Sequence, residues 1–227
     1  MTLPRLRPPA LPPAGPPEAG SVFFALLATG DIVLILLHVA WKTAWQRPPQ
    51  VWLITRDYSF GEMFQYAKEG WSLLLLGILL WRTGERRLLA LLGVMAIVLA
   101  DDALRIHEFV SLSISDGLGR PSLIGLPAVQ LIEFVWLAAF GATLLVAIWL
   151  STLGAPAGYR RFACRLGGLF IVLGLLAGGM DAVHALIKGI AMDVLEDGGE
   201  LLVTSAIVSV IFGEALRQRP LCDHETV

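Results

Sequence analysis

Six apolar runs, each long enough to cross a lipid bilayer, constrain the fold of this chain more than any other feature. They cover residues 21–43, 60–82, 87–111, 124–151, 162–189 and 196–217. A helix rises about 1.5 Å per residue, so about 20 residues span the roughly 30 Å hydrocarbon core of a bilayer. We therefore predict an all-α fold, a polytopic transmembrane bundle of about six helices over residues 21–217.

The composition of the whole chain agrees with a membrane protein. Hydrophobic residues make up 56% of the 227 residues, charged residues make up 16%, and the mean hydropathy is +0.71. Soluble domains carry about 25% charged residues. The net charge of −2 and the lack of a basic stripe argue against a nucleic-acid partner. The lipid bilayer is thus the expected partner, and two cysteines are too few for a disulfide framework.

The ends of the chain and the basic residues predict an orientation. Residues 1–20 hold seven of the thirteen prolines and should form a disordered tail, and residues 218–227 form a short C-terminal tail. In this topology, ten Lys and Arg residues lie on the side of the two termini and five on the other side. Because basic residues favour the cytoplasmic side, we predict an inner (plasma) membrane protein with both termini in the cytoplasm.

Ionisable residues inside the apolar runs concentrate toward the opposite, outer side. A charge within a bilayer costs at least about 2.5–3.5 kcal/mol, so such residues normally face the bundle interior and serve a function. We predict that they share one pocket in the outer half of the bundle. The set comprises Glu62, Glu69, Asp101, Asp102, Glu108, Glu133, Asp181, Glu196, Asp197, Glu200, Lys68, Arg105, Lys188, His38, His107 and His184.

The charge balance of this set predicts a bound cation. Ten carboxylates against three fixed cations cannot all be ionised in a low-dielectric pocket, so they must be protonated, hydrogen-bonded to one another, or bound to a cation. Carboxylates with imidazoles are ligands for Zn, Mn or Fe. The spacing of Asp181 and His184 matches the carboxylate-x-x-His pair of helical metal sites. The predicted ligands are Asp102, His107, Asp181, His184 and His38.

Other members of the set have predicted catalytic or supporting roles. Glu108 or Glu200 would act as the general base on a water bound to the metal. The predicted supporting residues are Asp101, Arg105, Glu69, Lys68, Glu133, Glu196 and Asp197.

Several of these residues also have a simpler interpretation. Asp101, Arg105 and Glu108 follow the i, i+4, i+7 spacing of one helix face and could form only a ladder of salt bridges. Glu196 and Asp197 precede the last apolar run and could cap the N-terminus of its helix. The isolated Asp31 fits a hydrogen-bonded core residue, and His38 could extend to the membrane interface.

The pattern leaves three functional hypotheses open. The first is a metal-dependent intramembrane hydrolase, acting on a small molecule or lipid, with its site open to the periplasmic leaflet. The second is a cation- or proton-coupled transporter with carboxylate relays, although the sequence has no obvious internal repeat. The third is a haem protein with two histidine ligands, or a structural protein, which leaves the carboxylates unexplained.

Three short strings resemble segments of uncharacterised bacterial multi-pass membrane proteins. They are LADDALRIHE at 99–108, LEDGGELL at 195–202 and YAKEG at 66–70. The resemblance spans the second to the sixth predicted helix and implies a bacterial inner membrane, but it implies no activity. The intramembrane metal-dependent hydrolases, such as alkaline ceramidases and adiponectin receptors, use three His and an Asp on seven helices. Their helix count and spacings do not match, so that comparison is an analogy only.

Overall fold

The all-α prediction is confirmed by a computed structural model, which describes residues 18–45, 49–119, 122–123, 126–180, 183, 187 and 189–217. Two short antiparallel strands, β1 (Ser122–Leu123) and β2 (Leu126–Pro127), connect α4 to α5. The helices are α1 (Glu18–Ala44), η1 (Gln50–Trp52), α2 (Phe60–Thr83), α3 (Leu88–Leu104), α4 (Ile106–Gly117), α5 (Ala128–Thr152), α6 (Ala157–Gly174), the π-helical η2 (Leu175–Met180) and α8 (Ile190–Arg217).

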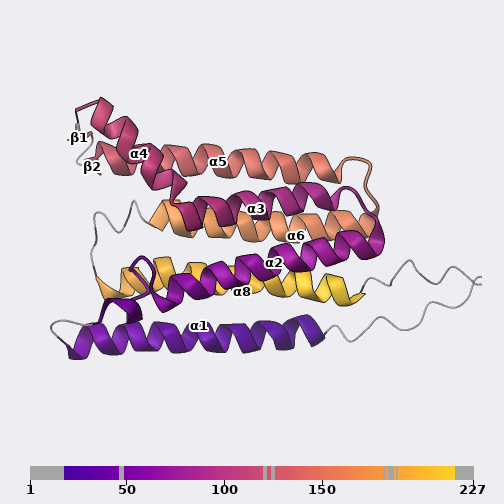
Figure 1. The fold of residues 1–227 in the computed structure, drawn as a ribbon, viewed down its shortest axis with the longest axis horizontal. Helices are drawn as coiled ribbons and strands as arrows, with labels where there is room; N and C mark the ends of the chain where they lie inside the picture. Colours follow the sequence, from indigo (N-terminus) through magenta and orange to yellow (C-terminus); the bar gives the residue numbers. More distant parts are fainter. Residues whose placement is uncertain are drawn as a thin grey trace, which may run out of the picture.

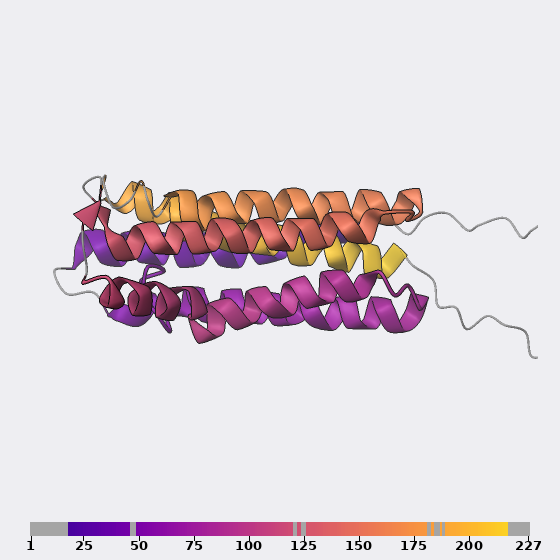
Figure 2. The same ribbon diagram turned by 90° about the horizontal axis from the view of Figure 1, so that it is seen from above.

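The long helices lie side by side in one elongated bundle (Figures 1 and 2). Helix α8 packs against α1, α2 and α6, and α5 packs against α3, α4 and α6. Four described helices are long and apolar enough to cross a membrane, namely Ala19–Ala44, Ala128–Thr152, Ala157–Met180 and Ile190–Arg217. Helices α2 and α3 run alongside them (Figure 1), which gives the bundle close to the predicted number of long helices.

The two ends of the bundle differ in chemistry. The start of α1, the end of α8, and the α2–α3 and α5–α6 connections share one end (Figure 1). This end contains the core of buried apolar side chains, which includes Leu91, Leu166 and Ile211. Seven of the nine arginines that the structure describes also lie there, at Arg82, Arg86, Arg87, Arg160, Arg161, Arg165 and Arg217. The opposite end holds most of the carboxylates that the sequence analysis assigned to a pocket.

The helix predicted over 87–111 is in fact two helices, which is a correction with consequences for the site. Arg105 adopts a left-handed conformation with φ 53° and ψ 44°, and the chain changes direction there (Figure 1). Such a conformation costs of order 1–3 kcal/mol unless its surroundings hold it. The Asp101 carboxylate holds it here, because it accepts a hydrogen bond of 3.1 Å from the His107 N–H at the start of α4. The ladder interpretation therefore holds for the Arg105–Glu108 pair, whereas Asp101 pairs with His107 and the three residues do not share one continuous helix face.

The last two predicted helices also differ from the structure. Helix α8 begins at Ile190, so Glu196 and Asp197 lie inside the helix, and their interpretation as N-terminal caps is wrong. Helix α6 ends at Gly174, and the π-helical segment η2 follows it directly and extends to Met180. Of the residues between this segment and α8, the structure describes only 183, 187 and 189.

Candidate functional site

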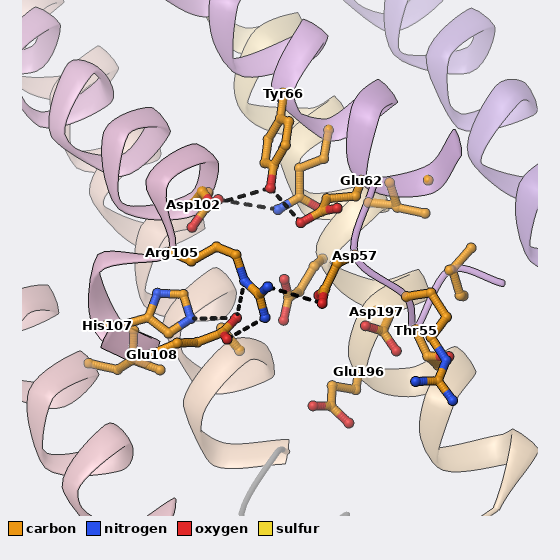
Figure 3. A pocket seen from close by; sticks show the side chains of 18 of the residues that line it. Thr55, Asp57, Glu62, Tyr66, Asp102, Arg105, His107, Glu108, Glu196 and Asp197 are labelled. Atoms are coloured by element: carbon orange, nitrogen blue, oxygen red, sulfur yellow. Dashed lines mark hydrogen bonds and ion pairs between the residues drawn. The ribbon is translucent and has the colours of Figure 1, made fainter. Parts of the chain in front are cut away.

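A cavity of about 350 Å³ lies at the carboxylate-rich end of the bundle (Figure 3). It is lined by side chains from α2, α3, α4, α5 and α8 and from the segment that precedes α2. Eight of the lining residues are carboxylates, and the basic lining residues are Arg56, Arg105 and His107. This excess of negative charge attracts cations. The eight are Asp57, Glu62, Asp102, Glu108, Glu133, Glu196, Asp197 and Glu200.

His107 is held in place by Asp101 at the junction between α3 and α4. The Nδ1 atom of His107 lies 3.0 Å from Oδ2 of Asp101, and the other oxygen of Asp101 accepts the His107 backbone N–H. An ionised carboxylate can only accept hydrogen bonds, so Nδ1 must be the donor. The Nε2 atom then faces two other carboxylates of the cavity. It lies 3.6 Å from Oε1 of Glu133 and 4.0 Å from Oε1 of Glu108.

Asp101, Asp102 and His107 form a group that could hold a metal ion. Each offers one ligand atom, and these atoms lie within 4.8 Å of one another. Ligand atoms bound to one metal at about 2.0–2.2 Å lie at most about 4.4 Å apart, so closing the group would require side-chain rotations that change the Asp101–His107 hydrogen bond. The donor set of two carboxylates and an imidazole suits Zn, Mn or Fe.

Helix α2 positions Asp102 from the other side of the cavity. Gln65 Nε2 donates to Oδ2 of Asp102 at 3.5 Å. The Tyr66 hydroxyl lies between the Glu62 carboxylate and the backbone oxygen of Asp102, 3.1 Å from the latter (Figure 3). These contacts restrict the orientation of Asp102, as ligand-bearing side chains require.

Glu69 lies behind this layer and is 1% exposed. Within the described residues, neither of its carboxylate oxygens has a hydrogen-bond partner. An unpaired buried carboxylate is costly, because it gives up hydration without compensation. It can be relieved by a proton or by a nearby cation.

The mouth of the cavity is crossed by Arg105. Its Nε atom donates to Oε1 of Glu108 at 2.8 Å, and its NH1 atom lies 3.1 Å from Oδ2 of Asp57 (Figure 3). The guanidinium therefore neutralises two of the eight carboxylates that line the cavity.

The structure brings together most of the described residues that the sequence analysis proposed. Asp102, His107, Glu108 and Glu200 line one cavity. The supporting residues Arg105, Glu133, Glu196 and Asp197 line it too. Asp101 contacts His107 from just outside the lining. Asp181 and His184 lie outside the described residues.

Two other proposed residues lie in different clusters. His38 is fully buried and its Nε2 lies 3.2 Å from Oδ2 of Asp193, which Lys42 also contacts. Lys68 is fully buried and pairs with Asp31 at 2.9 Å. The two described histidines thus bond to different carboxylates, and the structure gives no support to a haem held between them.

Sequence reasoning missed Asp57 and Gln130, which also line the cavity. Gln130 lies three residues before Glu133 on α5, and this helical spacing places the two side chains on one face. Asp57 lies in the segment between η1 and α2, where no periodic pattern indicates the direction of a side chain.

Comparison with known proteins gives a family without an assigned activity. One family model, described as a domain of unknown function (DUF8692), matches residues 26–212. No curated protein matches the chain. No solved structure matches it either.

Proposed function

This chain belongs to the DUF8692 family, and we propose that it is an integral membrane protein that binds a divalent metal ion, Zn, Mn or Fe, and uses it for hydrolysis. The observation that carries the proposal is the Asp101, Asp102 and His107 group, with ligand atoms within 4.8 Å of one another. The cavity beside it is lined by carboxylates in excess of basic residues.

Three features support a metal ion over protons alone. The Asp101–His107 hydrogen bond orients the imidazole so that its other nitrogen, Nε2, faces the carboxylates Glu133 and Glu108, which is an arrangement typical of a metal-binding histidine. Gln65 fixes Asp102 from the opposite side. The buried Glu69 carboxylate interacts with the Asp102 carboxylate, and a nearby cation would compensate the two negative charges.

The arrangement also supports hydrolysis. A divalent ion polarises a carbonyl or phosphoryl oxygen and lowers the pKa of water. Glu108 or Glu200, both in the cavity lining, would accept the proton of the attacking water. Arg105 lies in the same lining and would stabilise negative charge on a substrate only if it exchanged its pairing with Glu108 or Asp57. No lining residue is a serine or a cysteine, so the described side chains favour direct attack by water.

The proposed location is a bacterial inner membrane, with the cavity open to the periplasm and both termini in the cytoplasm. Four helices that are long and apolar enough to cross a bilayer support the membrane location. The arginines at the end of the bundle opposite the cavity support the orientation, because basic residues remain in the cytoplasm.

The test is elemental analysis of the detergent-purified full chain. We expect about one metal ion per chain in the wild type, and loss of the ion in His107→Ala and in Asp102→Asn. Glu85→Gln is the matched control, because Glu85 is a carboxylate that pairs with Arg87 in the α2–α3 connection, away from the cavity. The proposal is wrong if the wild type holds no metal as purified and takes up neither Zn, Mn nor Fe on reloading.

A second candidate, proton- or cation-coupled transport, is favoured by one observation. Glu69, Lys68 and Asp31 are ionisable residues buried in the bundle outside the cavity lining, and Lys68 pairs with Asp31. In liposomes with a pH-sensitive dye inside, a transporter would carry protons down an imposed gradient, and Glu69→Gln would abolish this flux. Equal dye responses with wild-type protein, with Glu69→Gln and with empty liposomes would exclude proton transport.

A further inference from the structure

A second cavity, of about 360 Å³, adjoins the acidic one and differs from it in chemistry. It lies between α3, α5, α6 and the π-helical η2. Most of its lining side chains are apolar, including Val98, Leu144 and Phe170. The two cavities share five lining residues, namely Gln65, Asp102, Leu137, Ala177 and Glu200.

We propose that this apolar cavity holds one acyl chain of a lipid substrate, whose hydrolysable polar end lies in the acidic cavity. The proposal rests on the proposed function, because it assigns a substrate class to the same site. A lipid is the expected occupant because the acidic cavity suits its polar end and the adjoining apolar cavity suits its hydrocarbon chain.

The distribution of polar groups gives the cavity a direction. Its polar lining residues within the described chain are Gln65, Asp101, Asp102 and Glu200. Three of these also line the acidic cavity, and Asp101 contacts His107. A hydrocarbon chain would therefore contact apolar side chains away from the acidic cavity. Its polar end would lie where the two cavities meet, next to the proposed metal ligands.

The length of the cavity fits a chain from one leaflet. Its lining on α5 extends from Phe134 to Leu145, which is eleven rises of about 1.5 Å, or about 16 Å. This is roughly half of the 30 Å hydrocarbon core. An acyl chain that occupies one leaflet of the bilayer therefore matches the cavity in length.

Small residues and a π-helical turn make room for the chain. Gly141 and Gly174 line the cavity, and a Cβ added at either would meet nothing within 4 Å. The π-helical segment Leu175–Met180 follows on the same wall, and such segments occur frequently at functional sites.

The cavity also opens sideways toward the surface that would face lipid. Phe134, Ile171 and Leu175 line it, and they are 43%, 49% and 63% exposed. A lipid could enter from the bilayer through this side without leaving the membrane.

The experiment uses the full chain in nanodiscs and a palmitic acid that carries a photoreactive diazirine in the middle of its chain. We expect cross-links, mapped by mass spectrometry, on the cavity-lining parts of α5 and α6. Gly174→Leu should lose them, because the leucine side chain fills open space in the cavity. Gly168→Leu is the matched control, since Gly168 lies on the same helix, is equally unobstructed and does not line the cavity.

Further variants separate the possible outcomes. Gly141→Leu repeats the test from α5 in case Gly174→Leu does not fold, and size-exclusion profiles verify folding of both. His107→Ala should lose the metal and keep the cross-links, so a missing metal site and a missing acyl site give different results. Cross-links that persist in both leucine variants, or that occur only at outward-facing positions such as Leu150, would overturn the proposal.

Discussion

Replacing Lys68 with methionine should lower the free energy of unfolding by about 3–5 kcal/mol, because it leaves a buried carboxylate without its counter-charge. Lys68 and Asp31 are both fully buried, and their charged atoms lie 2.9 Å apart. The Lys68 ammonium also donates to the Leu201 carbonyl at 2.7 Å and to Ser205 Oγ at 3.2 Å. The ion pair thus joins α1, α2 and α8 in the interior of the bundle.

Thermal unfolding in detergent would measure this effect. Arg87→Met is the control, because Arg87 is 38% exposed where it pairs with Glu85, and an exposed pair contributes about 1 kcal/mol or less. The double variant Asp31→Leu with Lys68→Met should regain much of the lost stability, since it removes both charges. If Lys68→Met unfolds at the same temperature as Arg87→Met, the buried pair does not stabilise the bundle.

Replacing Asp101 with asparagine should weaken metal binding by about 10–100-fold, because carboxylates that orient a metal-binding histidine have effects of this size. Both oxygens of Asp101 contact His107, at 3.1 Å to its backbone nitrogen and 3.0 Å to Nδ1. Asparagine keeps the shape of the side chain but removes the charge that favours the Nδ1–H tautomer. The main loss should therefore be in affinity and not in folding.

Competition with a chromophoric chelator would measure the affinity of each variant. Asp57→Asn serves as the control, because Asp57 lines the same cavity but pairs with Arg105 and is 55% exposed. Complete loss of the metal in Asp101→Asn would make Asp101 a direct ligand. An unchanged affinity would contradict both roles.

The fold and the gathering of carboxylates at one end of the bundle were predictable because both depend on patterns that are local in sequence. Long apolar runs can satisfy their backbone hydrogen bonds in a membrane only as helices or closed barrels, so their lengths predict the bundle. Alternating helix direction then places Glu62, Asp102 and Glu200 at the same end of the bundle, and all three line the cavity. No information about contacts was needed for this step.

The detailed contacts were not predictable, because they depend on which faces of distant helices meet. Lys68 and Asp31 are 37 residues apart, and neither spacing nor composition pairs them. The break at Arg105 is equally hidden, since residues 99–108 contain neither glycine nor proline. It depends on one side-chain hydrogen bond, from His107 N–H to Asp101, which propensities do not include.

The buried pair of Asp31 and Lys68 has a consequence for how the chain is made. If the chain enters a membrane as we propose, α1 is synthesised before α2, so Asp31 reaches the lipid while Lys68 is still missing. A lone aspartate at the centre of a helix opposes partitioning into lipid by about 2.5–3.5 kcal/mol. Transfer of α1 into lipid is therefore more favourable once α2 has been synthesised, because the two helices can then enter as a hairpin in which Asp31 and Lys68 neutralise each other.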